Sequence, residues 1–191
     1  MQTEINKVEL RNLRIEDYKE LKKSMMEAYS ELDNAYWKEH HINKLLTIFP
    51  EGQLVILVDG KVVGSALSLI VNEDTANSTH NYADITGNYT FSTHDPLGDV
   101  LYGIDVFIHP KYRGLRLGRR LYDTRKELCE QLNLKAIIFA GRIPNYTKYS
   151  GEITPKIYID KVRQKEIYDP VLSFQLSNDF PVIKIMRNYL E

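Results

Sequence analysis

The order of apolar and polar positions along the chain predicts alternating strands and helices. Residues 8–13, VELRNL, are predicted to form the first strand. Two helices follow, because apolar side chains then recur every three or four positions. The first helix opens at Glu16 and Asp17, and the second ends at residues 50–52, where a proline and a glycine stop it. Their inner stripes are Tyr18, Leu21, Met25 and Tyr29, and then Trp37, His41, Leu45 and Ile48.

The rest of the chain predicts a hairpin and then further strands and helices. Asp59-Gly60 is the strongest short hairpin signal in the sequence, because it separates two apolar runs. Apolar runs and helical spacing then alternate to the end, which favours an α/β fold. The predicted strands are residues 54–58, 62–70, 99–108, 136–140 and 182–190, and the predicted helices are residues 117–132, 155 to about 166, and 170–177.

Residues 72–98 break this pattern, being rich in Asn, Thr, Ser, His and Asp with scattered aromatic side chains. Loops longer than about 12 to 15 residues are usually functional or disordered, and the aromatic residues argue against disorder. One hypothesis is that this segment folds over an acceptor site, with Tyr89, His94 and Asp95 as contacts. A surface insertion without a role in binding is the alternative, and the sequence leaves both open.

Composition and charge fit one compact domain over residues 1–191. A chain with 43% hydrophobic and 27% charged residues can bury a sizeable core. Its 25 basic and 26 acidic residues give a net charge of −1, which provides no global field for nucleic acid or an anionic membrane. We find no leader, no apolar run long enough to cross a bilayer, and only one cysteine. We therefore expect a cytoplasmic protein with neither nucleic-acid nor membrane partners.

Neither the cysteine nor the histidines predict a reactive or metal site. Cys129 lies well inside a predicted helix, which favours packing over a role as nucleophile. The histidines show no ligand spacing with cysteine or with carboxylates, so no metal is expected. They are His40, His41, His80, His94 and His109.

Residues 106–121, VFIHPKYRGLRLGRRL, predict a cradle for an anion. An apolar strand passes through a proline and a glycine-bearing turn into an amphipathic helix. The first turn of a helix has unpaired N–H groups and the positive end of the helix dipole, and a pyrophosphate fits there. An ordinary strand–turn–helix connection with surface arginines is the alternative. The local positive charge comes from Lys111, Arg113, Arg116, Arg119 and Arg120.

The segment from Arg113 to Gly118 resembles the R/Q-x-x-G-x-G/A signature of the GNAT superfamily of acyl-CoA N-acyltransferases. Arg113 and Gly118 match, whereas Arg116 replaces the middle glycine. The resemblance covers most of the chain and implies the GNAT fold, a mixed central sheet flanked by helices. It also implies acetyl-CoA as cosubstrate. Its diphosphate would be held by Arg113, Gly114, Leu115, Arg116, Leu117, Gly118 and Arg119, and its pantetheine arm by Val106, Phe107, Ile108 and Asn145.

Amine acylation also needs a group that takes a proton from the attacking amine. Asp105 is the one acid embedded in an otherwise apolar strand, where burial would raise its pKa, so it is our candidate base. A carboxylate that holds loop backbone, or that pairs with an arginine such as Arg142, is the alternative. Asp99 and His109 are weaker candidates for the base.

The C-terminal part departs from the family pattern. Members often carry a tyrosine in the last helix that protonates the leaving thiolate, and this chain has Phe174 and Gln175 in that region. Either Tyr146, Tyr149 or Tyr168 serves instead, or the thiolate leaves without a positioned acid, which its low pKa makes tolerable.

The resemblance implies an N-acetyltransferase that passes an acetyl group from acetyl-CoA directly to a primary amine of a small molecule or peptide within a ternary complex. The alternative is a catalytically degenerate GNAT domain that binds CoA or a partner domain as a sensor or scaffold. Arg116 and the missing tyrosine favour that alternative. Residues 102–146 resemble more narrowly the acetyltransferase half of bacterial proteins in which a carbon-nitrogen hydrolase domain follows. Such a domain in a longer parent chain is therefore a candidate partner.

Overall fold

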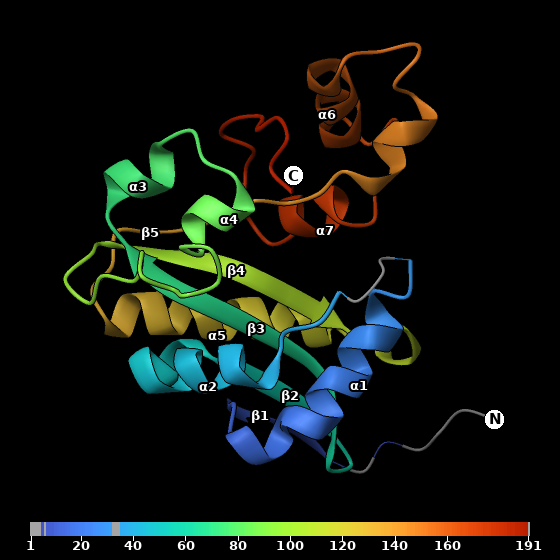
Figure 1. The fold of residues 1–191 in the computed structure, drawn as a ribbon. Coiled ribbons are helices and arrows are strands. Elements are labelled where there is room, and N and C mark those ends of the chain that lie inside the picture. The colour runs from blue at the N-terminus through green and yellow to red at the C-terminus, as the bar shows by residue number, and fades with distance from the viewer. Residues whose placement is uncertain (1–4, 6, 32–34, 191) are drawn as a thin grey trace. The chain divides into compact units, whose positions relative to one another are not determined.

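The computed structural model describes residue 5, residues 7–31 and residues 35–190 of the 191-residue chain. The chain divides into two compact units, one up to Phe139 and one from Ala140 to Tyr189 (Figure 1). The first unit contains the sheet and the predicted cradle. The second unit contains two further helices.

The first unit is built on one mixed sheet, as the resemblance implied. The strands follow one another across the sheet in chain order, antiparallel from β1 to β4, while β5 runs parallel to β4. They are β1 (Val8–Asn12), β2 (Leu54–Val58), β3 (Lys61–Val71), β4 (Val100–Ile108) and β5 (Ala136–Phe139). The hairpin between β2 and β3 is confirmed. Asp59 and Gly60 have φ of 48° and 78°, the left-handed pair that a tight two-residue hairpin turn needs.

Helices cover both faces of this sheet (Figure 1), with α5 along one face and α1 and α2 along the other. They are α1 (Tyr18–Ala28), α2 (Glu39–Ile48), α3 (Glu73–Asn77), α4 (Tyr82–Ile85) and α5 (Leu117–Gln131). Helices α3 and α4 lie within residues 72–98. The prediction that Trp37 belongs to the second helix was wrong, because Lys38 has extended backbone and α2 begins after it. Trp37 is instead held in the connection before α2.

A β-bulge in β4 decides which side chains face which side of the sheet. Gly103 pairs with Ser68 and Asp105 pairs with Leu67, so Ile104 is an extra residue on β4. Side chains alternate along a regular strand, so Asp105 would share the face of Gly103 if Ile104 were paired in the ladder like its neighbours. The bulge turns Asp105 to the opposite face.

The two faces of β4 therefore have different neighbours. Val106 and Ile108 pack toward α5, in a core cluster that includes Leu117 and Leu121. Leu121 is fully buried, and a Leu→Ala change at such a position typically costs about 2–5 kcal/mol. A second cluster on α5 contains Leu128 and Cys129 and extends to Phe49, Ile70 and Leu101. Cys129 is thus a packed core residue.

The second unit has its own small core around α6 (Pro155–Arg163) and α7 (Leu172–Leu176). The Thr154 hydroxyl accepts a hydrogen bond from the Ile157 N–H and caps α6, and Pro155 follows at the first helical position, as predicted. Tyr158 is fully buried and donates to Asp169 Oδ2 at 2.7 Å. Its neighbours are Ile159, Val162 and Leu172.

The predicted final strand over residues 182–190 was wrong, because these described residues have no strand conformation. A strand is held by a ladder of main-chain hydrogen bonds to a neighbour, and apolar alternation alone does not supply one. Ile183 and Ile185 are 67% and 45% exposed, so neither side chain is fixed by burial. Pro181 also removes a donor at the start of the segment.

Candidate functional site

The candidate site begins where β4 loses its second neighbour. Strand β5 pairs with β4 only from Val100 to Gly103, so among the described strands none borders residues 104–108 on that edge. The His109 N–H donates to Val63 O on β3 at 2.7 Å. Because N–H and C=O groups alternate between the two edges of an antiparallel strand, the main-chain groups of Val106 and Ile108 point to the open edge.

Side-chain donors from several elements hold the carbonyl groups along this stretch. The Tyr82 hydroxyl donates to Ile104 O at 2.9 Å, and Arg125 Nη2 donates to Asp105 O at 2.7 Å. Arg113 Nε donates to Ile108 O at 3.3 Å. The donors come from α4, from α5 and from the turn before α5, so side chains of three elements contact the main chain of residues 104–108.

Asp105 lies beside this edge, on the face toward α1. Its Oδ1 accepts a hydrogen bond of 2.6 Å from the Tyr29 hydroxyl, and its Oδ2 accepts one of 3.2 Å from Trp37 Nε1. Burial is the largest influence on this carboxyl and raises its pKa above the ordinary value. The two hydrogen bonds and the charge of Arg125 act in the opposite direction. The partners of Asp105 are therefore aromatic donors of the first unit, whereas Arg142 belongs to the second unit.

Arg125 is a buried cation on the other side of the bulge. The side chain comes from α5, is only 1% exposed, and donates through Nη2 to Leu67 O at 2.6 Å as well as to Asp105 O. A Cβ atom at Gly103 would lie 2.9 Å from Nη1, so the glycine leaves room for the guanidinium. Burial lowers the pKa of Arg125 to about 10, and the group stays protonated at neutral pH. Its Nε has no hydrogen-bond partner within the described chain.

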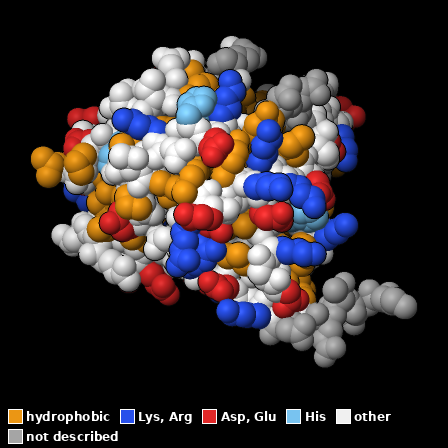
Figure 2. All heavy atoms as spheres, turned by 60° about the horizontal axis from the view of Figure 1, so that its bottom comes forward, with side chains coloured by type: hydrophobic (Ala, Val, Ile, Leu, Met, Phe, Trp, Pro, Cys, Tyr) orange, Lys and Arg blue, Asp and Glu red, His pale blue; other side chains and the backbone are white. Residues whose placement is uncertain are grey.

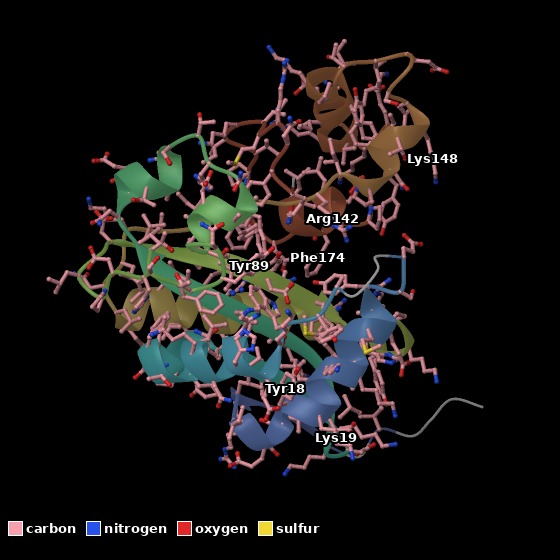
Figure 3. The ribbon with its side chains drawn as sticks, in the orientation of Figure 1. Tyr18, Lys19, Tyr89, Arg142, Lys148 and Phe174 are labelled. Carbon is pink, nitrogen blue, oxygen red and sulfur yellow. The ribbon has the colours of Figure 1, made fainter. Side chains whose placement is uncertain are left out.

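An aromatic layer covers the side of Asp105 that faces α2. The ring of Trp37 lies 5.6 Å from that of Phe91 and 6.2 Å from that of Tyr82. Tyr89, labelled in Figure 3, stacks on His41 of α2 with ring centroids 5.6 Å apart, and it is 43% exposed. Tyr89 therefore lies at the surface end of the layer, at the rim of a hollow of about 400 Å³. This hollow is lined by His40, His41, Lys44, Asn88, Tyr89 and Thr90.

Two residues proposed as acceptor contacts have local partners instead. His94 Nδ1 accepts a hydrogen bond from the Ile70 N–H at 3.1 Å, its ring stacks on Phe49, and burial lowers its pKa. Asp95 accepts hydrogen bonds from the Asn72 amide and from the Leu97 N–H. His94 thus attaches the segment 72–98 to β3, and the Asp95 side chain links residues within that segment. Tyr89 is the member of the predicted set that lies at an open surface.

The cradle segment has the predicted strand–turn–helix geometry. A short 3₁₀ turn (Pro110–Tyr112) is followed by Gly114 with φ of 84° and by Arg116 with φ of 58°, after which α5 begins at Leu117. The side chain of Arg116, the residue before α5, makes no capping hydrogen bond in the described structure. The N–H groups of the first turn of a helix have no partner within the helix, so those of α5 remain available. Arg116, which replaces the signature glycine, thus has the left-handed backbone that glycine adopts most easily.

The predicted cofactor residues divide by environment. Leu117 is buried in the core, while Leu115 is 44% exposed beside the turn. Phe107 is buried on the face of Asp105, where its ring lies 5.9 Å from that of Tyr29. The arginines and glycines of the cradle lie at or near the surface. Asn145 belongs to the second unit, where its amide donates to Tyr168 O at 3.1 Å.

The two weaker candidates for the base have other partners. Asp99 accepts from Lys135 Nζ at 2.6 Å and from the Glu73 N–H. His109 Nε2 lies 2.8 Å from Glu27 Oε2, and its Nδ1 accepts from the Lys111 N–H. Within the described chain no group of three His, Cys, Asp or Glu side chains could hold a metal ion.

Sequence reasoning missed three residues that surround Asp105. Tyr29 and Trp37 were interpreted only as members of apolar helical stripes, and nothing local distinguishes them from core residues. Arg125 carried a usable signal, because it falls four residues after Leu121 and three before Leu128, on the apolar side of the helix. A charged residue at such a position is buried only when it has polar partners.

Charged side chains of both signs share one face of the molecule. Figure 2 shows Lys and Arg side chains interspersed with Asp and Glu on the face that it displays. No helix in the described part of the chain combines the length and the apolar character needed to cross a bilayer.

Known proteins resemble this chain in both sequence and fold. It is 47% identical over 154 residues to YhcX of Bacillus subtilis (strain 168), a probable hydrolase. The matched region covers 81% of this chain and 30% of YhcX. It is 37% identical over 155 residues to YkwB of the same organism, an uncharacterized N-acetyltransferase, with 81% and 69% covered. The chain thus spans less than a third of YhcX. This partial match agrees with the expected resemblance to a GNAT domain joined to a hydrolase.

Two solved structures share the fold at low identity. The loading GNATL domain of CurA from Lyngbya majuscula has a TM-score of 0.77 at 22% identity, covering 90% of this chain and 83% of that one. The GphF GNAT-like decarboxylase in complex with isobutyryl-CoA has a TM-score of 0.72 at 19% identity, covering 88% and 84%. The predicted fold class is confirmed. Residues 10–148, more than half of the sequence, match the family model, and the chain therefore belongs to the acetyltransferase (GNAT) family.

Proposed function

We propose that this chain is an acetyl-CoA-dependent N-acetyltransferase that passes the acetyl group directly to a primary amine of a small molecule or peptide in a ternary complex. Family membership supports acyl transfer. The observation that carries the finer proposal is the open edge of β4, which is followed, after the turn of residues 109–116, by the start of α5 with its unpaired N–H groups. A long, extended ligand with a diphosphate group matches that path.

The cradle fits a diphosphate in both charge and space. The first-turn N–H groups of Leu117, Gly118 and Arg119 have no partner within α5, and the helix dipole adds positive potential there. A Cβ placed on Gly114 meets no atom within 4 Å, so the turn is open on that side. The exposed guanidinium groups of Arg113 and Arg116 would add charge-assisted hydrogen bonds.

The open edge of β4 offers main-chain groups to the rest of the coenzyme. The N–H and C=O groups of Val106 and Ile108 point to that edge, where they would pair with the amide groups of a pantetheine arm as a neighbouring strand does. Main-chain N–H groups that are already fixed in position also stabilise the oxyanion that develops on a thioester carbonyl during attack. The thioester supplies the activated acyl group, and the chain supplies the alignment.

Asp105 is the group that we assign to proton removal. It is the acid beside the open edge, and its raised pKa brings it closer to the range useful for a general base at neutral pH. Its two hydrogen-bond donors keep the carboxyl in one orientation. The acceptor amine would approach from the same face as α1 and the aromatic layer.

The alternative function, a degenerate GNAT domain that acts as a sensor or scaffold, has one specific observation in its favour. Arg116 places an exposed side chain where the signature has glycine. Under this alternative the chain would bind CoA or a partner domain without turnover. Binding and turnover experiments separate the two functions.

Calorimetry with acetyl-CoA tests the cradle first. We expect Arg113→Ala to weaken binding by about 10-fold or more, since hydrogen bonds to charged groups contribute about 1.5–3 kcal/mol. Gly118→Trp should abolish binding, because the indole covers the first-turn N–H groups. Lys19→Ala is the matched control, since it removes the same charge from an exposed site on α1 (Figure 3) and should leave affinity unchanged. Equal affinity in all three variants would refute the cradle.

A panel of primary amines, monitored by thiol release from acetyl-CoA, then tests turnover. Release that depends on an amine and that falls at least 100-fold in Asp105→Asn supports the acetyltransferase. Tight binding of acetyl-CoA without release for any amine would favour the sensor or scaffold.

A further inference from the structure

Tyr29 is the polar group through which Asp105 meets the open edge of β4. It follows the last residue of α1, and its hydroxyl oxygen lies 2.6 Å from Asp105 Oδ1 and 3.4 Å from Val106 O. One side of the tyrosine hydroxyl therefore contacts the carboxylate, and another is close to a main-chain carbonyl of the open edge. Tyr29 is only partly buried, in contrast to the fully buried core residues of α1 such as Leu21.

The second donor to Asp105 has a different chemistry. Trp37 is 6% exposed and presents an indole N–H, which donates but accepts nothing. A tyrosine hydroxyl both donates and accepts, so it can take up one proton while it gives up another. Of the two side chains in the described part of the chain that donate to the carboxylate, Tyr29 is the one that can connect it to a third group.

We propose that Tyr29 is a catalytic residue of the acetyltransferase, which carries the proton of the attacking amine to Asp105. This inference rests on the function proposed above and names the group that would touch the amine. It also explains why both oxygens of the proposed base, Asp105, accept hydrogen bonds. One bond, from Trp37, fixes the carboxylate, and the other, from Tyr29, is the path of the proton.

Two proton transfers accompany the attack of the amine on the thioester. The nitrogen lone pair of the neutral amine forms a bond to the thioester carbonyl carbon, and the C–S bond breaks so that coenzyme A leaves as the thiolate. An N–H proton of the amine passes to Tyr29 Oη while the Tyr29 hydroxyl proton passes to Asp105 Oδ1. The products are the amide, the thiolate and protonated Asp105, with Tyr29 neutral as before.

Burial and hydrogen bonding act on the carboxyl of Asp105 in opposite directions. Burial is the largest influence and raises its pKa, whereas the hydrogen bonds from Tyr29 and Trp37 and the charge of Arg125 on α5 lower it. Among the described residues of α1 and its end, the titratable group that contacts the carboxyl is Tyr29, and the connection before α2 contributes the neutral indole of Trp37.

A purely structural brace is the competing explanation, and two matched variants separate it from the relay. Tyr29→Phe and Trp37→Phe each remove one donor to Asp105, so both should raise its pKa and move the acid limb of kcat/KM to higher pH. We expect only Tyr29→Phe to lower the plateau of kcat, by about 100- to 1,000-fold, as general acid–base groups do. Trp37→Phe should lose less than about 10-fold. The amine used is the one that releases most thiol in the panel above.

The outcomes distinguish the relay from the proposed function. Equal loss of kcat in the two variants would overturn the relay and leave the acetyltransferase standing. No thiol release from the wild type would overturn both. Calorimetry with acetyl-CoA should give the same affinity in wild type and in both variants, which shows that the cradle is intact.

Nuclear magnetic resonance provides a readout that needs no turnover. In protein with ¹³C-labelled tyrosine rings, the Tyr29 ¹³Cζ signal is assigned as the one absent from Tyr29→Phe. We expect it to shift through the pH range in which Asp105 titrates and to lose that shift in Asp105→Asn. A Tyr29 signal that ignores the titration of Asp105 would overturn the relay.

Discussion

The backbone of Arg116 allows a prediction whose sign is unusual. Within helices and strands, a protein with glycine at a given position is less stable than one with alanine by about 0.5–1 kcal/mol, because glycine loses more conformational freedom on folding. At Arg116 the φ and ψ angles are 58° and 18°, which is left-handed backbone that crowds a Cβ atom. We therefore expect the variant Arg116→Gly to be more stable than Arg116→Ala.

The magnitude follows from the two opposing effects. A residue other than glycine in left-handed backbone costs about 1–3 kcal/mol of stability, and replacing it with glycine removes this strain. The greater entropy that glycine loses on folding offsets about 0.5–1 kcal/mol of that gain. The net preference for glycine is about 1 kcal/mol. For a chain of this size that is a rise in Tm of about 2–4 °C. Comparing glycine with alanine, rather than with arginine, keeps the charge of the two variants equal.

Thermal and urea unfolding of the two variants measure this difference. Arg120 provides the matched control, because it is exposed on the same helix with ordinary helical backbone. There the pair Arg120→Gly and Arg120→Ala should show the usual order, with glycine less stable by about 1 kcal/mol. The reasoning is refuted if Ala is the more stable residue at both positions.

Two further predictions concern the buried polar groups. Arg125→Met should lower the free energy of unfolding by about 2–5 kcal/mol, because Leu67 O and Asp105 O lose their donor; a Tm within 2 °C of wild type would contradict this. Burial lowers the pKa of His94 in the folded state below its value of about 6.5 in the unfolded chain. The contribution of the neutral His94 side chain to folding stability is therefore complete above about pH 6.5, and it is lost as the pH falls from there through the folded-state pKa. Urea unfolding at pH 7 and pH 5 should therefore show a smaller loss of stability in His94→Phe than in wild type, and equal losses would exclude His94 as the source.

Local signals predicted the parts of the molecule that local geometry controls. The Asp59-Gly60 hairpin depends on two residues that tolerate positive φ, and it is present where predicted. The turn and helix from Pro110 to Gln131 likewise follow from a proline, a glycine and helical spacing. Asp105 was selected because a lone acid stands out in an apolar strand, and the structure places it beside the open edge of β4.

Features that depend on residues distant in the sequence were not predictable from the pattern. The partners of Asp105 are 76 and 68 residues away along the chain, and Tyr29 and Trp37 look like ordinary aromatic core residues. The wrong prediction of a strand over residues 182–190 has the same cause. The apolar side chains of Ile183 and Ile185 alternate with polar ones as in a strand. A strand also needs a neighbouring strand with a free edge to which its main chain can hydrogen-bond.

The extra residue in β4 changes the shape of the strand without changing the face on which Asp105 lies. Removing Ile104 would join Gly103 directly to Asp105, and both would keep their partners Ser68 and Leu67 and therefore their faces. Such a deletion would straighten β4, because a bulge bends its strand and increases the local twist. Homologues with one residue fewer at this point should therefore keep the acid on the face of α1 and differ in the direction in which residues 106–108 run.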